Sequence, residues 1–333
     1  MNNVSSLLRS CPFILLLALM AASDSAAQGL DSRIVFASNR DGDWDIYSMD
    51  VNGDNLLQLT DHPASDHQPA ASPDGRRIAF TSERGGTPDL YVMDSDGNNV
   101  IGLAHEGFSK FGPTWSPDGT RIAFCSLRDV VGNFEIYAMD ADGNNLTRLD
   151  KHEFHDILPS WSPDGSKIAF VSYRDGGVND PFHIFVMNAD GTGRRNLTAD
   201  TQLRKNSNPS WSPDGSKIAF SSYRHFVPAR SRNDIFVITA DGKELEQLTD
   251  GPGTSTLPVY SPDGTKIAYV SGRRGDSNIY IMDANGMNVV KLTRTPPGVD
   301  NRSPSWPQGA LAVNPSGKLP ISWGVLKRTG NPR

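Results

Sequence analysis

The chain has 333 residues, of which 37% are hydrophobic and 21% are charged, and its formal net charge is −6. This acidic balance gives no basic surface of the kind that binds nucleic acid. About 300 residues can bury a large core, and with only two cysteines, Cys11 and Cys125, the fold must be stabilised by packing rather than by a disulfide framework.

Residues 1–27 have the pattern of a secretory signal peptide. Arg9 precedes an apolar run from Phe13 to Ala22, and small residues follow at 25–27. The run is shorter than the roughly 20 residues that cross a bilayer, and an uncleaved anchor is the alternative interpretation. No later segment is long and apolar enough to span a membrane, so we expect an exported protein that lies in the periplasm or outside the cell.

From residue 28 to residue 307 the chain repeats one unit. The unit begins with a strand ending in Pro-x-Trp/Tyr-Ser, turns at Ser-Pro-Asp-Gly, continues with Ile-Ala-Phe/Tyr and then Ile-Tyr-x-Met, turns again at Asp/Asn-Gly, and ends on leucine. The Ser-Pro-Asp-Gly turns begin at Ser72, Ser116, Ser162, Ser212 and Ser261, so the units are 44, 46, 50 and 49 residues long. This is the length of a four-stranded propeller blade.

The ends of the repeat predict a closed ring. The pattern starts at a second strand, residues 33–38, and its last element is a first strand that includes Trp306. Together these fragments make one more blade, which predicts an all-β, six-bladed propeller closed by pairing of the two ends. A linear stack of blades is the alternative. Residues 308–333 do not continue the repeat, and we expect a poorly ordered C-terminal tail.

The spacing within the repeat separates two faces. Both turn spacings are constant, whereas the loops between the second and third strands and between successive blades vary in length. Variable loops on one face of a repeat protein commonly form its binding surface. They are rich in aromatic residues and arginine, which favours a protein-binding patch, although packing between blades and solvent exposure explain them equally well. The residues concerned are Phe134, Tyr173, Phe182, Tyr223, Phe226, Arg128, Arg174, Arg224, Arg230 and Arg232.

Two further sets of residues recur at fixed positions. An arginine follows the second strand of every unit, and we expect it to pair locally with the residue that opens the third strand, in preference to forming a ring for an acidic partner. The three residues before the first-strand proline, such as Asp66-His67-Gln68 and Asp156-Ile157-Leu158, differ between units. We expect them to face the mouth of a central channel, as a recognition site would.

The sequence gives only weak support for a catalytic site. Five of the seven histidines, His62, His67, His105, His152 and His155, lie in the loops between blades, and imidazole and carboxylate groups converging there could hold a metal. No short-range ligand spacing supports such a site, and exposed loop histidines explain the pattern better. The chain has no Gly-x-Ser-x-Gly motif, so a hydrolase triad is not indicated.

The combination of Pro-x-Trp-Ser-Pro-Asp-Gly-x-x-Ile-Ala-Phe and Ile-Tyr-x-Met-Asp-x-Asp-Gly, from Arg33 to about Pro307, resembles the repeat of the TolB propeller family. The resemblance implies a six-bladed fold, a periplasmic location and a protein partner, such as an envelope protein or lipoprotein. In that family the propeller of TolB binds the peptidoglycan-associated lipoprotein, and a separate N-terminal domain, for which we expect no counterpart here, binds TolA. Related exported propellers include lyases that use a metal held by loop histidines.

The sequence therefore predicts a non-enzymatic module that binds a protein partner through the variable loops and the channel mouth, with no cofactor. The alternative is a metal-dependent lyase or hydrolase acting on a polysaccharide or similar substrate, using His67, His105 or His155 with Asp66 or Asp156. The residues predicted to contact the partner are Asp66, His67, Lys110, Phe111, His155, Asp156, Arg174, Lys205, Arg224, Phe226 and Arg302.

Overall fold

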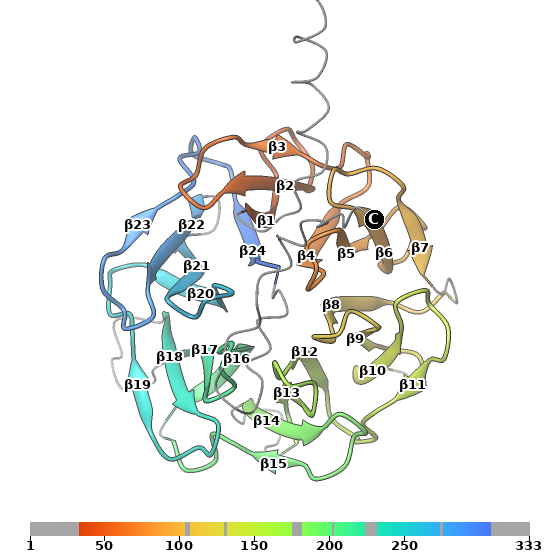
Figure 1. The fold of residues 1–333 in the computed structure, drawn as a ribbon, viewed down its shortest axis with the longest axis vertical. Coiled ribbons are helices and arrows are strands. Elements are labelled where there is room, and N and C mark those ends of the chain that lie inside the picture. The colour runs from red at the N-terminus through yellow and green to blue at the C-terminus, as the bar shows by residue number, and fades with distance from the viewer. Residues whose placement is uncertain are drawn as a thin grey trace, which may run out of the picture.

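The computed structural model describes residues 33–103, 107–129, 132–174, 182–201, 203–223, 232–273 and 276–307. These residues form six four-stranded antiparallel sheets arranged as blades around a central channel (Figure 1). The predicted all-β, six-bladed propeller is confirmed. The predicted signal peptide and C-terminal tail lie outside the described residues. Within the described part, no helix is long and apolar enough to cross a membrane.

Each blade runs from an inner strand A to an outer strand D. From blade 1 to blade 6, the A strands are β24 (Asn301–Ser305), β4 (Asp66–Ala71), β8 (Lys110–Trp115), β12 (Asp156–Trp161), β16 (Arg204–Trp211) and β20 (Thr254–Tyr260). The B strands are β1 (Arg33–Ser38), β5 (Arg77–Ser82), β9 (Arg121–Ser126), β13 (Lys167–Ser172), β17 (Lys217–Tyr223) and β21 (Lys266–Arg273). The C strands are β2 (Asp45–Asp50), β6 (Asp89–Asp94), β10 (Glu135–Asp140), β14 (His183–Asn188), β18 (Asn233–Thr239) and β22 (Asp276–Asp283). The D strands are β3 (Leu57–Gln58), β7 (Ile101–Leu103), β11 (Thr147–Arg148), β15 (Arg195–Asn196), β19 (Leu245–Gln247) and β23 (Val290–Lys291).

The ring closes in blade 1, where β24 pairs with β1 in antiparallel register. Ser305 lies opposite Val35, and Asn301 lies opposite Ser38. Segments more than 260 residues apart in the sequence thus share one sheet, and Arg40 Nη2 donates to Asn301 Oδ1 across the same closure at 2.9 Å. Closure by the two ends, predicted from the sequence, is confirmed, and it leaves no unpaired blade edge at the junction.

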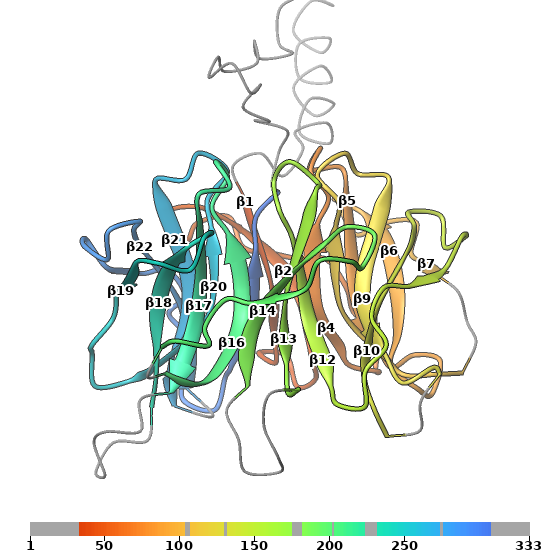
Figure 2. The ribbon, with the colours of Figure 1, turned by 90° about the horizontal axis from the view of Figure 1, so that it is seen from below.

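The propeller has two unlike faces (Figure 2). The A–B turns and the C–D turns lie on one side, which we call the turn face. The B–C loops and the connections from each D strand to the next A strand lie on the other, which we call the loop face. The turns of constant length thus form the turn face, and the connections of variable length form the loop face. This is the separation that the sequence predicts.

Contacts between blades explain the constant spacing of the C–D turn. Gly53 in blade 1 has a φ of +89°, and a Cβ atom there would lie 2.8 Å from the carbonyl oxygen of Leu292, the residue that follows the D strand of blade 6. Gly286 stands in the same relation to Leu248 of blade 5, also at 2.8 Å. The glycine therefore allows a left-handed turn and close approach to the preceding blade.

The hydrophobic core lies between blades as much as within them. One cluster joins Val171 and Ile184 of blade 4 to Phe220 and Phe236 of blade 5. Two of the strand A tryptophans, Trp115 and Trp211, add a hydrogen bond to the preceding blade. Trp211 Nε1 donates to the carbonyl oxygen of Ser160 in the preceding blade at 3.2 Å. At these two junctions the blades are therefore joined on the channel side as well as through the hydrophobic core.

Candidate functional site

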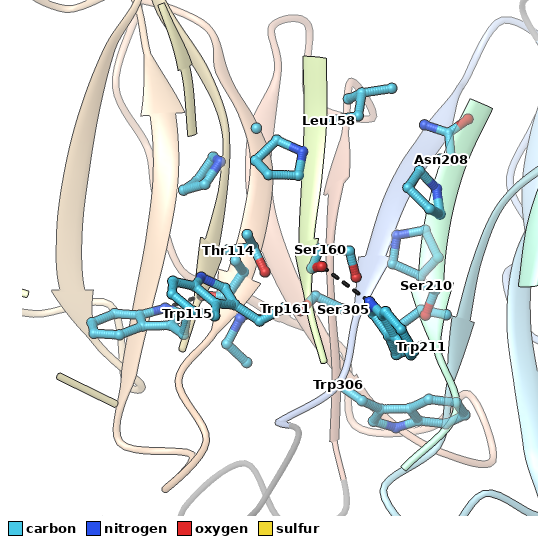
Figure 3. Close-up of a pocket in the computed structure, with 18 of the residues that line it drawn as sticks. Thr114, Trp115, Leu158, Ser160, Trp161, Asn208, Ser210, Trp211, Ser305 and Trp306 are labelled. Carbon is cyan, nitrogen blue, oxygen red and sulfur yellow. Dashed lines mark hydrogen bonds between the residues drawn. The ribbon is translucent and has the colours of Figure 1, made fainter. Parts of the chain in front are cut away.

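The A strands enclose a central cavity of about 260 Å³ (Figure 3). Its described lining consists mainly of proline, serine, tryptophan and small apolar residues, and none of these lining side chains is ionisable. Figure 3 shows Trp115, Trp161, Trp211 and Trp306 near one end of the cavity, with Leu158 and Asn208 near the other. The channel therefore presents an uncharged wall of apolar groups and neutral hydrogen-bonding groups.

Each A strand carries a β-bulge at the residue before its proline. The pairing of strands A and B shifts register there in all six blades. The residue at the bulge has left-handed φ in every case, and its side chain or backbone lines the cavity. We call this set the channel ring: Gln68 (49°), Gly112 (62°), Leu158 (55°), Asn208 (56°), Leu257 (55°) and Ser303 (51°).

The channel ring combines a fixed backbone with variable side chains. Left-handed φ is unfavourable for a bulky residue, yet Leu158 and Leu257 adopt it. Backbone strain that persists at one place in a fold often marks a functional site. Neighbouring members also interact, since Gln68 Oε1 accepts a hydrogen bond from the Gly112 amide at 3.0 Å. The variation at these positions is visible in the sequence, whereas the bulge that turns them toward the channel is not.

The residue two before each channel-ring residue is buried, which corrects the expectation that the whole triplet faces the channel mouth. Asp66 and Asp156 are 0% exposed and Lys110 is 1% exposed. Their backbone amides pair with the preceding blade, as Asp156 does with the carbonyl oxygen of Phe134 at 2.8 Å. The bulge separates the three positions: the first side chain enters the blade, and the third lines the channel.

The constant spacing of the arginines reflects a local role in the three blades where the structure shows it fully. Arg84 donates to Asp66 at 2.9 Å and to the hydroxyl oxygen of Ser82 at 2.8 Å. Its guanidinium also lies 4.9 Å from the ring centroid of Tyr91. Arg40 in blade 1 and Arg174 in blade 4 repeat this arrangement. The predicted local role is confirmed there, but the partner opens strand A and not, as was predicted, strand C.

Blade 4 differs from the others by an extra buried carboxylate. Arg174 Nη2 contacts Asp156 Oδ2 at 2.7 Å and Asp150 Oδ2 at 2.5 Å, and Arg194 Nε contacts Asp150 Oδ1 at 2.9 Å. Asp150 and Asp156 are 1% and 0% exposed. Burial and the neighbouring charge of Asp150 raise the pKa of Asp156 to about 7. Asp150 is not among the residues predicted from the sequence. It follows the strand D leucine where four other blades have threonine (Thr60, Thr198, Thr249 and Thr293).

A second buried ion pair joins blades 2 and 3. Lys110 Nζ lies 2.9 Å from Asp89 Oδ1, and both side chains are almost fully buried. Lys110 occupies the position of Asp66 and Asp156 but pairs with the preceding blade. Its ammonium group therefore holds two blades together and is not presented to a partner at the surface.

Half-buried aromatic rings form a continuous chain on the loop face of blades 3 and 4. Centroid distances are 5.7 Å from Phe111 to Phe134, 5.7 Å from Phe134 to His155, 5.6 Å from His155 to Tyr173, and 4.2 Å from Tyr173 to Phe182. His155 Nδ1 also accepts a hydrogen bond from the Phe134 amide at 3.0 Å. We call these five residues the aromatic chain. Such rings supply much of the binding energy at protein interfaces.

Other predicted residues lie around the same mouth. Trp44 lies between His67, at 5.2 Å between ring centroids, and the guanidinium of Arg302, at 5.0 Å. Burial lowers the pKa of His67, which favours its neutral form. The exposed Lys205 has its ammonium 5.6 Å from the ring centroid of Tyr223. The predicted contacts Arg224 and Phe226 lie outside the described residues.

The loop histidines that the structure describes have local partners. His62 Nδ1 and His152 Nδ1 accept hydrogen bonds from the amides of Ala64 and Phe154, at 3.0 and 3.3 Å. Among the described residues, no three histidine, cysteine, aspartate or glutamate side chains are grouped so that they could hold a metal ion. His105 lies outside those residues. These contacts give His62 and His152 a structural role in shaping the loops.

Comparison with known proteins agrees with this architecture. In the curated "Protein TolB homolog" of Chlorobaculum tepidum, 44 residues are 48% identical, which is 13% of this chain and about a tenth of that protein. One similar solved structure is TolB from Acinetobacter baumannii, with a TM-score of 0.69 and 22% identity over 91% of this chain and 75% of that one. Another is a putative TolB from Agrobacterium tumefaciens, with a TM-score of 0.65 and 24% identity over 80% of this chain and 91% of that one. Oligogalacturonate lyase from Vibrio parahaemolyticus shares the fold, with a TM-score of 0.56 and 16% identity over 80% of this chain and 76% of that one.

The family model described as the TolB beta propeller domain matches residues 29–125, 103–225 and 192–314. Since these overlapping segments cover nearly all of the repeat region, the chain belongs to the TolB β-propeller domain family.

Proposed function

We propose that this protein is a periplasmic interaction module that binds a protein partner on its loop face, with an uncharged segment of the partner inserted into the channel mouth. Membership of the TolB propeller family and the predicted signal peptide support this location and role. The channel ring is the observation that carries the proposal. It keeps one left-handed backbone conformation in six blades while its side chains differ.

The chemistry of the channel defines the part of the partner that enters. Because none of the described lining side chains is ionisable, an inserted charge would lose its hydration without gaining a counter-ion. An apolar or hydroxyl-bearing segment can instead pack on proline and tryptophan and hydrogen-bond to Gln68, Asn208 or Ser303. The inserted segment is therefore uncharged.

The rim of the mouth supplies the remaining contacts. The aromatic chain offers apolar area on blades 3 and 4, and the exposed Arg302 and Lys205 favour acidic groups beside the inserted segment. Of the predicted contacts, we retain His67, Phe111, His155, Lys205 and Arg302 as partner-binding residues, together with Arg224 and Phe226. Asp66, Lys110, Asp156 and Arg174 act by holding the loop face in place.

Capture from a native envelope extract tests the proposal. The immobilised protein should retain one identifiable protein, and Leu257→Asp should reduce its recovery by about tenfold or more, because the carboxylate would be desolvated in the channel without a partner. Thr120→Asp, an exposed position in an A–B turn, is the control for charge alone and should leave recovery unchanged. Equal recovery with wild type and Leu257→Asp would place the interface elsewhere.

A further inference from the structure

Large apolar side chains are exposed along the outer edge of three neighbouring blades. They occupy the two positions that lie three and two residues before the strand D leucine in blades 6, 1 and 2. We call these residues the apolar arc, with exposed fractions in parentheses: Val289 (52%), Val290 (53%), Leu56 (44%), Leu57 (53%), Val100 (38%) and Ile101 (62%). Val51 and Met287, in the adjoining C–D turns, are also exposed. Adjacent exposed apolar groups on this scale mark a surface that something covers.

The other three blades do not continue the arc. Two residues before the strand D leucine, they have Thr147, Arg195 and Glu246. Leu245 in blade 5 is exposed but stands between Glu244 and Glu246. The D strands are also the outermost strands of their sheets, as β23, β3 and β7 show in Figure 1. β23, β3 and β7 are thus sheet edges, to which another strand can be added.

We propose that residues 319–326 of the same chain cover the apolar arc by adding a strand to β3 at the outer edge of blade 1. This proposal concerns a different surface from the proposed partner-binding face and does not depend on it. It also replaces the sequence-based expectation of a poorly ordered tail with a specific docking site.

The sequence of this segment has the pattern of a strand with one apolar face. Leu319, Ile321, Trp323 and Val325 alternate with Pro320, Ser322 and Gly324. A period of two places the four large side chains on one side of an extended chain, where they can lie over the arc. Pro320 is compatible with an added edge strand, since the outer side of such a strand needs no amide donor.

The position of the chain end makes this docking site accessible. β24 ends at Ser305 in blade 1, the central blade of the arc, and runs toward the turn face, where the exposed C–D turns lie. Strands A and D of one blade are about 15 Å apart, three spacings of roughly 4.8 Å. Residues 308–318 can span about 35 Å when extended. The linker is therefore long enough to reach β3 from the inner strand.

Charge favours the same location. Residues 308–333 contain Lys318, Lys327, Arg328 and Arg333 and no acidic residue, within a chain of net charge −6. The C–D turns beside the arc expose the carboxylates of Asp54 and Asp96. Basic groups on both sides of residues 319–326 can thus approach acidic turns while the apolar side chains meet the arc.

Disulfide trapping in the full chain tests the docking. In a Cys11→Ser background, Leu57→Cys combined with Val325→Cys should form an intramolecular disulfide about ten times faster than the control pair Leu245→Cys and Val325→Cys. The remaining Cys125 is buried, and burial raises its thiol pKa to about 12, so it does not compete. Equal rates for the two pairs, or a disulfide between two chains in place of one within a chain, would overturn the proposal.

Hydrogen exchange provides a second readout that needs no cysteine. The full-length double variant Ile321→Asp with Trp323→Asp should exchange faster than wild type at the amides of β3, with unchanged exchange at β19 in blade 5. It should also bind a hydrophobic dye more strongly, since the arc becomes uncovered. Unchanged exchange at β3 would show that the segment does not lie there.

Discussion

Asp156→Asn tests whether the blade 4 carboxylate pair carries a proton near neutral pH. Asp156 is fully buried and shares Arg174 Nη2 with Asp150. Burial and the charge of Asp150 raise its pKa to about 7, against about 3.9 in an unfolded chain. The folded state therefore binds this proton more tightly. The resulting stability is complete below about pH 4 and is lost as the pH rises through 7.

The magnitude follows from the difference in pKa. Each unit is worth about 1.4 kcal/mol, so between pH 5 and pH 8 this group lowers the free energy of unfolding of the wild type by up to about 2.6 kcal/mol. The amide introduced by the substitution would not titrate, and Asn206 and Asn301 already occupy the equivalent position in blades 5 and 1. We expect Asp156→Asn to match the wild type at pH 5 and to be more stable than it at pH 8.

Urea unfolding followed by tryptophan fluorescence at both pH values measures this effect. Asp241→Asn is the control, because Asp241 is exposed and hydrogen bonds from Lys243 and Thr239 lower its pKa, so that it stays ionised between pH 5 and pH 8. The control should not change the pH dependence. Equal destabilisation by Asp156→Asn at both pH values would mean that Asp156 is ionised throughout, as an ordinary partner of Arg174, and would refute the reasoning.

Three further substitutions test the fold and the channel ring. Leu257→Asn gives blade 6 the residue that blade 5 has at Asn208. It should raise the free energy of unfolding by about 1 kcal/mol, because asparagine tolerates left-handed φ better than leucine does. A free energy of unfolding no higher than that of the wild type in urea titration would show that no strain is stored there. Gly53→Ala should destabilise the protein by about 2 kcal/mol more than Gly86→Ala, because Gly86 has nearly the same φ but a Cβ atom there would meet no atom within 4 Å. Equal losses in thermal melts would argue against the contact between Gly53 and Leu292. Lys110→Ala should cost about 3 kcal/mol because it leaves the buried Asp89 without its cation, whereas a loss below about 1 kcal/mol in urea unfolding would indicate a pair worth no more than a surface one.

The repeat made the fold predictable from sequence. Asp-Gly and Asn-Gly turns at constant distances specify hairpins, and a terminal B strand with a terminal A strand implies closure, which β1 and β24 confirm. The constant spacing has a packing reason that the sequence does not reveal: Gly53 and its equivalents lie against the preceding blade.

The site was less predictable because the bulge changes where side chains point. Strand A of a propeller lines the channel, so the sequence predicts Asp66, Lys110 and Asp156, which precede its proline, at the channel mouth, yet all three are buried. A bulge inserts a residue into one strand and changes the direction of the side chains around it. The proline that follows is the only sequence feature associated with this bulge. Asp150 was not predicted for a different reason. The only sign of it in the sequence is that an aspartate replaces the threonine found at this position in four other blades.

Hydrogen exchange of the protein alone and with the partner recovered by affinity capture tests the central claim most directly. If the partner binds the loop face and enters the channel, amides from residue 152 to Leu158 and at the starts of β8 and β16 should exchange more slowly in the complex. The A–B turns at the opposite ends of the same strands should be unchanged. Protection confined to the turn face would contradict the account.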